Sequence, residues 1–190
     1  MSVKSIYQYL MSLAVCAVAL AEVRHIDTAA STVTVKVSKA GVLSAFGHDH
    51  QIRAPIASGT VDTDNNKVEL RISTPALKVV DSGTSDKDRA EIQSTMLGPE
   101  VLDAERSREI VFRSTAAERQ PDGWMITGDL TLHGQTNRVV VQVTEHQGGK
   151  YVGVAHIRQA DFGIKPVKVA GGTVRVKDEV RIEFAIQLAH

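Results

Sequence analysis

Two histidines that flank one aspartate are the residues of this chain best suited to chemistry. They end the stretch Phe46 to His50, which reads FGHDH. Side chains alternate between the two faces of an extended strand, so His48 and His50 are expected on the same face. Imidazoles that converge in this way can bind zinc or copper, although such a site needs at least a third ligand. The first candidate for that third position is His133, with His156 and Asp161 behind it.

Two other roles for the histidine pair stay open at this point. Imidazole titrates near neutral pH and forms hydrogen bonds, so the pair could contact the polar head of a ligand, such as a phosphate or a quinone oxygen. Alternatively, the pair is structural, with hydrogen bonds to Asp86, Asp88 or the nearby backbone. The elements that position His48 and His50 must decide between these roles.

Other classes of function lack their usual signals. The sequence contains no Gly-x-Ser-x-Gly elbow, no glycine-rich phosphate loop and no His-Glu-x-x-His motif, so we predict that the protein is not an enzyme. The 22 basic residues are balanced by 22 acidic ones, so there is no basic patch of the size that nucleic acids require. Aromatic residues make up only 4%, which disfavours stacking on bases. We therefore expect no nucleic-acid partner.

The first 21 residues have the pattern of a signal peptide. Lys4 precedes the apolar run Leu10 to Leu20, and Ala19-Leu20-Ala21 fits the small-x-small cleavage rule. We predict cleavage after Ala21, a periplasmic or secreted protein, and no stable membrane insertion after cleavage. The only cysteine, Cys16, lies in this segment, which excludes disulfides and thiolate metal sites from residues 22–190.

Residues 22–190 are expected to form one all-β domain. Apolar and polar residues alternate along several segments, as in Val33, Val35 and Val37, which indicates strands with one apolar face. Eight or nine such antiparallel strands must close a barrel or stack as a sandwich. The predicted strands are Ser31–Val37, Gln51–Val61, Val68–Ser73, Glu109–Thr115, Trp124–Leu132, Arg138–Thr144, Tyr151–Arg158, Gly172–Lys177 and Val180–Leu188, with a turn at Lys177-Asp178 between the last two.

One segment between two predicted strands has helical spacing instead. Over Ser85 to Leu97, Ile92 and Met96 lie four residues apart and share a face. Ser85 is suited to cap the first turn, and Gly98-Pro99 ends the helix. We predict a crossover helix that covers one end of the barrel.

Four segments spread over residues 22–190 together resemble the YceI family of periplasmic, lipocalin-like proteins that bind polyisoprenoids. These are Asp27–Val37, Asp86–Arg89 with the helix that follows, Gly128–Thr136 (GDLTLHGQT) and Ala160–Ile164 (ADFGI). The two histidines after Gly47 depart from the family's usual small, glycine-containing stretch. This departure indicates a branch with a Gly-His-Asp-His signature.

The resemblance implies a single lipocalin-like antiparallel barrel of about eight strands with a helical insertion. It also implies an isoprenoid-type lipid, a polyprenyl phosphate or a quinone, as the amphiphilic ligand in the lumen. The alternatives are a metal-binding protein that uses His48, His50 and His133, and a barrel with a solid core; a homodimer is left open. The residues expected to bind the ligand are Val35, Val37, Phe46, His48, His50, Leu70, Ile72, Phe112, Leu130, Leu132, His133, Val141, Phe162 and Phe184.

Overall fold

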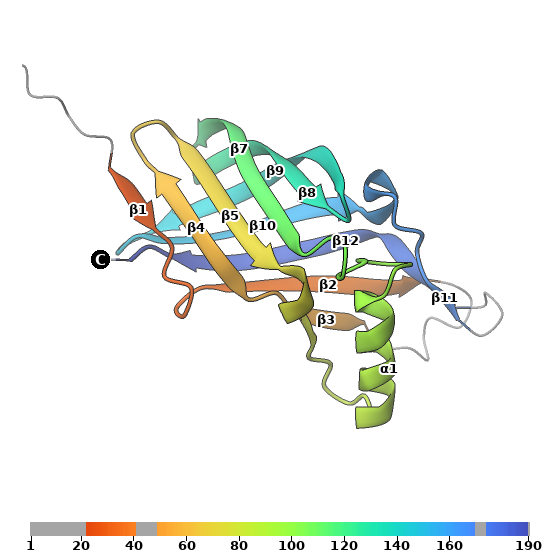
Figure 1. Ribbon diagram of the computed structural model, residues 1–190. Coiled ribbons are helices and arrows are strands. Elements are labelled where there is room, and N and C mark those ends of the chain that lie inside the picture. The colour runs from red at the N-terminus through yellow and green to blue at the C-terminus, as the bar shows by residue number, and fades with distance from the viewer. Residues whose placement is uncertain (1–21, 41–48, 170–173, 190) are drawn as a thin grey trace, which may run out of the picture.

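The computed structural model describes residues 22–169, except 41–48, and residues 174–189. It confirms the all-β prediction, because the described chain forms one curled antiparallel sheet with a single α-helix at one end (Figure 1). The strands are β1 (Val23–His25), β2 (Thr32–Ala40), β3 (His50–Arg53), β4 (Ile56–Asp62), β5 (Lys67–Ser73), β6 (Lys78–Val79), β7 (Glu109–Gln120), β8 (Gly123–Leu132), β9 (Gln135–His146), β10 (Lys150–Arg158), β11 (Lys168–Val169) and β12 (Val174–Gln187). The helices are α1 (Asp86–Leu97) and the 3-10 turns η2 (Thr74–Ala76) and η3 (Gln159–Phe162).

The prediction of about eight strands was wrong, because the described residues form twelve. Eleven follow one another in the order β1-β4-β5-β7-β8-β9-β10-β12-β2-β3-β6, and β11 pairs with β12. The predicted strand Gln51–Val61 is split at Ala54-Pro55 into β3 and β4, since proline has no N–H for a ladder. After this corner β4 pairs with β1 and β5, whereas β3 pairs with β2 and β6.

The predicted turn at Lys177-Asp178 was also wrong, because both residues lie inside β12. The pairing of β12 with β2 shifts register between Val176 and Val180, so the strand bends there without ending. Asp178 ties this bend to the segment that joins β10 to η3. Its carboxylate accepts hydrogen bonds from the Ala160 N–H (2.8 Å) and from Nε of Arg158 (3.0 Å). Residues 172 and 173 of the predicted strand lie outside the described residues.

The sheet curls until β1 meets the end of β12. The Asp27 N–H donates to the carbonyl of Gln187, and the Ala189 N–H donates to the carbonyl of His25, both at 2.8 Å. Ile26 and Leu188 form a bridge between these two bonds. Since β1 also pairs with β4, these contacts bring the two sides of a half-barrel together at one end.

Helix α1 is confirmed, with Ser85 as its cap: the Ser85 Oγ accepts a hydrogen bond from the Asp88 N–H at 3.1 Å. Its Met96 is buried in the core. The helix stands beside β3 at one end of the sheet, called here the helix end (Figure 1). The loops β4–β5, β7–β8 and β9–β10 lie at the opposite end, the hairpin end. Neither α1 nor any other helix among the described residues has the length and apolar character to cross a membrane.

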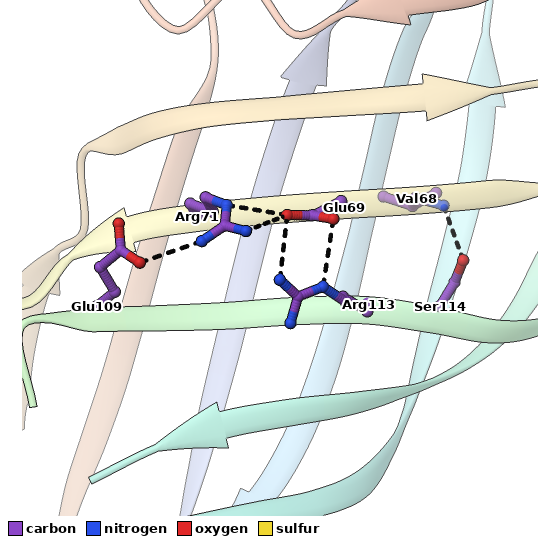
Figure 2. A network of polar contacts seen from close by, with 6 residues as sticks. All are labelled: Val68, Glu69, Arg71, Glu109, Arg113 and Ser114. Atoms are coloured by element: carbon purple, nitrogen blue, oxygen red, sulfur yellow. Dashed lines mark hydrogen bonds and ion pairs between the residues drawn. The ribbon is translucent and has the colours of Figure 1, made fainter. Parts of the chain in front are cut away.

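A network of ion pairs ties β5 to β7 on the outer face (Figure 2). Glu69 accepts from Arg71 at 2.7 Å and from Arg113 at 3.2 Å, and Arg71 also reaches Glu109 at 3.1 Å. The main-chain pairing of β5 with β7 ends at Glu69 and Arg113. The network therefore runs along the whole of this pairing, from Glu69 and Arg113 at one end to Glu109 at the other. Hydrogen bonds from Arg71 are the main reason that the pKa of Glu69 lies below its ordinary value.

This lowered pKa predicts how acid affects the contribution of Glu69 to stability. The contribution is fully present above the pKa that Glu69 has in the unfolded chain, and it is lost as pH falls through the lower pKa of the folded state. We expect Glu69→Gln to lower the urea midpoint at neutral pH, and we expect the difference from the wild type to vanish in acid.

Glu118→Gln is the matched control for this urea series. Glu118 is an exposed glutamate on the same strand as Arg113, and it forms no ion pair with any described residue. The difference in urea midpoint between Glu118→Gln and the wild type should not change with pH. A Glu69→Gln difference of equal size at every pH would contradict the assignment.

Candidate functional site

The concave face of the curled sheet encloses a cavity of about 1000 Å³. This volume is at the upper end of the range of small-molecule sites, roughly 300–1,000 Å³. The cavity extends from residues of α1 at the helix end to residues of the β4–β5 loop at the hairpin end. Between the two ends its lining is largely aliphatic and aromatic. The polar side chains of the lining lie mainly at the helix end and at the hairpin end.

The alternating pattern of the strands places the predicted inward residues on this cavity. The lining includes Val35, Val37, His50, Leu70, Ile72, Phe112, Leu130, Leu132, Val141 and Phe184. Several of them, including Val35, Leu70 and Phe184, are only half-buried although they point inward. The area that they expose faces the cavity, as expected for an open lumen. The outward residues between them pair on the outside, as in the 2.7 Å ion pair of Lys36 with Glu183.

Two other predicted ligand residues lie in the wall of the sheet and not among the residues that line the cavity. Phe162 is only 1% exposed, and its turn η3 packs against β9 and β10. The pairing of β9 with β10 ends at Val141 and Ala155, and Phe162 lines a second, smaller pocket together with residues of both strands beyond that point. His133, at the β8–β9 turn, forms a 3.1 Å hydrogen bond from Nδ1 to the carbonyl of Phe162. Phe46 and His48 lie outside the described residues.

The described residues do not assemble the predicted metal ligands. His50 and His133 have different partners, Asp81 and the carbonyl of Phe162 respectively. No group of three or more histidine, cysteine, aspartate or glutamate side chains that could hold a metal ion occurs in the part of the chain that the structure describes. The third predicted ligand, His48, is not in that part.

His50 forms a close pair with Asp81 at the helix end of the cavity. Nδ1 of His50 lies 2.5 Å from Oδ2 of Asp81, and the other carboxylate oxygen accepts the Gln51 N–H at 2.6 Å. The side chain of Asp81 is 1% exposed and that of His50 is 15% exposed. The expectation that Asp86 or Asp88 would hold the histidine was therefore wrong for His50. Asp86 pairs with Arg89 instead, at 2.9 Å.

Sequence reasoning missed Asp81, because nothing local distinguishes it. It is a lone aspartate between the two-residue strand β6 and the helix. Only the pairing of β6 with β3 brings it beside His50. A single acidic residue in a connecting segment is usually exposed, so its burial was not visible from the sequence.

A second polar cluster, centred on Glu145, lies at the hairpin end and was also missed. Glu145 accepts hydrogen bonds from Arg119 (3.1 Å), Trp124 Nε1 (3.4 Å) and the Tyr151 hydroxyl (3.4 Å). The guanidinium of Arg119 lies over the ring of Trp124, 4.9 Å from its centre. Trp124, Glu145 and Tyr151 all line the cavity. Burial, and after it the charge of Glu145, raises the pKa of the Tyr151 hydroxyl above its ordinary value.

The sequence matches a known family over most of its length. A model of the YceI-like domain matches residues 25–188. A UPF0312 protein of Vibrio parahaemolyticus is 28% identical over 170 residues, which cover 83% of this chain and 84% of that protein. A UPF0312 protein of Vibrio campbellii is 27% identical over the same shares of the two chains.

Solved structures share the fold at lower sequence identity. The crystal structure of Burkholderia cenocepacia BcnA aligns with a TM-score of 0.59 and 20% identity, and the alignment covers 87% of this chain and 99% of that one. A mutant YCEI protein of Campylobacter jejuni aligns with a TM-score of 0.51 and 11% identity over 81% of this chain and 85% of that one. These likenesses show that the curled antiparallel sheet is a fold the proteins share.

The Glu145 cluster gives a prediction for the titration of Tyr151. We expect this hydroxyl to ionise above the ordinary tyrosine range. Glu145→Gln should lower its pKa only part of the way back, because burial, the larger cause, remains. Ultraviolet absorbance measures tyrosinate directly. Subtracting the titration of Tyr151→Phe removes the signal of the chain's other tyrosines, Tyr7 and Tyr9. If the pKa of Tyr151 were the same in Glu145→Gln as in the wild type, Glu145 would not act on this hydroxyl as the cluster implies.

Proposed function

Since the chain belongs to the YceI-like domain family, a family of β-barrel proteins, we propose that its curled sheet forms a lipocalin-like barrel that binds an isoprenoid-type lipid in the lumen. In this proposal the protein is a binding protein and not an enzyme. It acts in the periplasm or outside the cell once residues 1–21 have been removed. The Gly47-His48-Asp49-His50 stretch then marks a branch of the family.

The observation that carries this proposal is the long apolar cavity. The interior of a barrel widens with its number of strands, and about eight strands already leave room for packed side chains or for one small ligand. Here the inward side chains leave about 1000 Å³ free. Each methylene that moves from water into such a space contributes about 0.8 kcal/mol, so a long hydrocarbon tail is the ligand that gains most.

The distribution of polar groups supports an amphiphile over a pure hydrocarbon. The middle of the cavity is apolar, whereas His50 lies at the helix end and Glu145 at the hairpin end. An isoprenoid tail suits the middle, and a polar head suits one of the ends. In this proposal the tail contacts Val35, Leu70 and Phe184.

Native mass spectrometry of the gently purified protein tests the proposal. We expect a bound species that organic solvent extracts and whose mass fits an isoprenoid lipid. Elemental analysis of the same sample provides the contrast. Stoichiometric zinc or copper without lipid would favour a metal-binding protein. If the protein carried neither and took up no added geranylgeraniol, the lipid proposal would be wrong.

A substitution that fills the cavity should weaken lipid binding. Val35 points into the cavity, and Val35→Phe would remove space for roughly two methylenes, which predicts about tenfold weaker binding of geranylgeraniol. The fluorescence of Trp124, the only tryptophan of the chain, can follow the titration because its ring lines the cavity.

Thr34→Phe is the matched control, since Thr34 is next to Val35 on the opposite face of β2. It should bind geranylgeraniol like the wild type. Equal weakening in both variants would show that the effect comes from a disturbed strand and not from the lumen.

A further inference from the structure

The pair formed by His50 and Asp81 specifies the chemistry of the ligand's head. We infer that the ligand carries an uncharged head that donates a hydrogen bond, such as a primary alcohol, to Nε2 of His50. This inference rests on the proposed function, because it assumes that the tail of the same ligand occupies the lumen. It goes further by choosing one end of the cavity and one class of head.

The first step concerns which nitrogen of His50 carries the proton. An ionised carboxylate can only accept hydrogen bonds. Asp81 lies 2.5 Å from Nδ1 of His50, so Nδ1 must hold the hydrogen and donate it. In the neutral imidazole the other nitrogen, Nε2, is then an acceptor. A ligand group that meets Nε2 of the neutral ring must therefore donate, which an alcohol does and an ether or a quinone oxygen does not.

The second step concerns the position of this acceptor. The His50 side chain lines the cavity, and its Nε2 has no hydrogen-bond partner among the described residues. Asp81 is held on both oxygens, by His50 and by the Gln51 N–H, so the ring cannot turn without losing a bond to a buried carboxylate. At the hairpin end, by contrast, Glu145 already accepts from three donors of its own chain. Nε2 of His50 is thus an acceptor at the helix end whose position is fixed by the protein.

The third step concerns charge. The described side chains that line the cavity include two lysines, Lys39 and Lys67, against four carboxylates, Asp62, Asp88, Glu91 and Glu145, and they include no arginine. Asp88 and Glu91 belong to α1, at the same end as His50, where Lys39 of β2 is the one lysine among these lining residues. Phosphate recognition normally uses guanidinium groups or clustered cations. An anionic head would meet net negative charge here, so a neutral head is favoured.

Three ligands with the same tail test the inference on the whole protein: geranylgeraniol, its methyl ether and its monophosphate. Trp124 fluorescence reports binding of each. We expect the alcohol to bind about fivefold to tenfold more tightly than the ether, which cannot donate, as one hydrogen bond would give. We expect the phosphate to bind more weakly than the alcohol.

Substitutions then assign the preference to the pair. His50→Phe keeps an aromatic ring but removes the acceptor. The affinity for the alcohol should therefore fall to that for the ether, and the affinity for the ether should not change. Asp81 acts as a positioning residue. In Asp81→Asn the preference for the alcohol should shrink, and the imidazole NMR spectrum should show that Nδ1 no longer holds the proton alone. His156→Ala is the control, because His156 is exposed and pairs with Glu179 on the outer face.

Each outcome separates the inference from the proposed function. Equal binding of alcohol and ether by the wild type would overturn the inference and leave the lipid function intact, as would tighter binding of the phosphate. Binding of none of the three would overturn both. The comparison of ligands on the wild type needs no variant, so it decides the matter even if His50→Phe fails to fold.

Discussion

The rest of the structure depends on the cross-strand pairing of inward side chains along β2 and β12. Val33 lies opposite Phe184, Val35 opposite Ile182 and Val37 opposite Val180. Because side chains alternate with a period of two, a slip of one residue would turn all of these side chains to solvent. The buried face thus fixes the register of both strands. It also fixes where His50 lies, since β3 pairs with β2 and places His50 opposite Val37.

Breaks and register shifts in the strands allow the sheet to curl without losing this register. Pro55 divides β3 from β4, and the shifts in β12 and between β4 and β5 bend the strands locally. Phe184 also has room for its ring because its cross-strand partner is Gly153, where an added Cβ would collide with that ring. The open lumen is therefore a product of both the alternation and these interruptions. A sheet without them would be flatter and would enclose less space.

The sequence was informative where structure is determined locally. Alternating valines predict a strand, and a serine cap followed by helical spacing predicts α1, because each signal lies within one turn or one strand. The interruptions were harder to foresee. Whether Lys177-Asp178 ends a strand or bends it depends on Ala160 and Arg158, which approach from another segment. For the same reason the inward set of the cavity followed from alternation, whereas Asp81 and the Glu145 cluster arise from contacts distant in sequence.

The helix that interrupts the strands has a structural role in the candidate site. Its Gln93 accepts the Val79 N–H and donates to the carbonyl of Leu77, both at 2.8 Å, so it satisfies the backbone of the short edge strand β6. Arg89 of the same helix donates to the carbonyl of Asp81 at 3.3 Å. These bonds hold the segment that carries Asp81 against β3. A buried carboxylate is costly unless it is hydrogen-bonded, and here β3 provides a partner for each oxygen, His50 Nδ1 for one and the Gln51 N–H for the other. The polar end of an otherwise apolar lumen therefore depends on two elements: β3 supplies His50, and the helical insertion holds the segment that places Asp81 beside it.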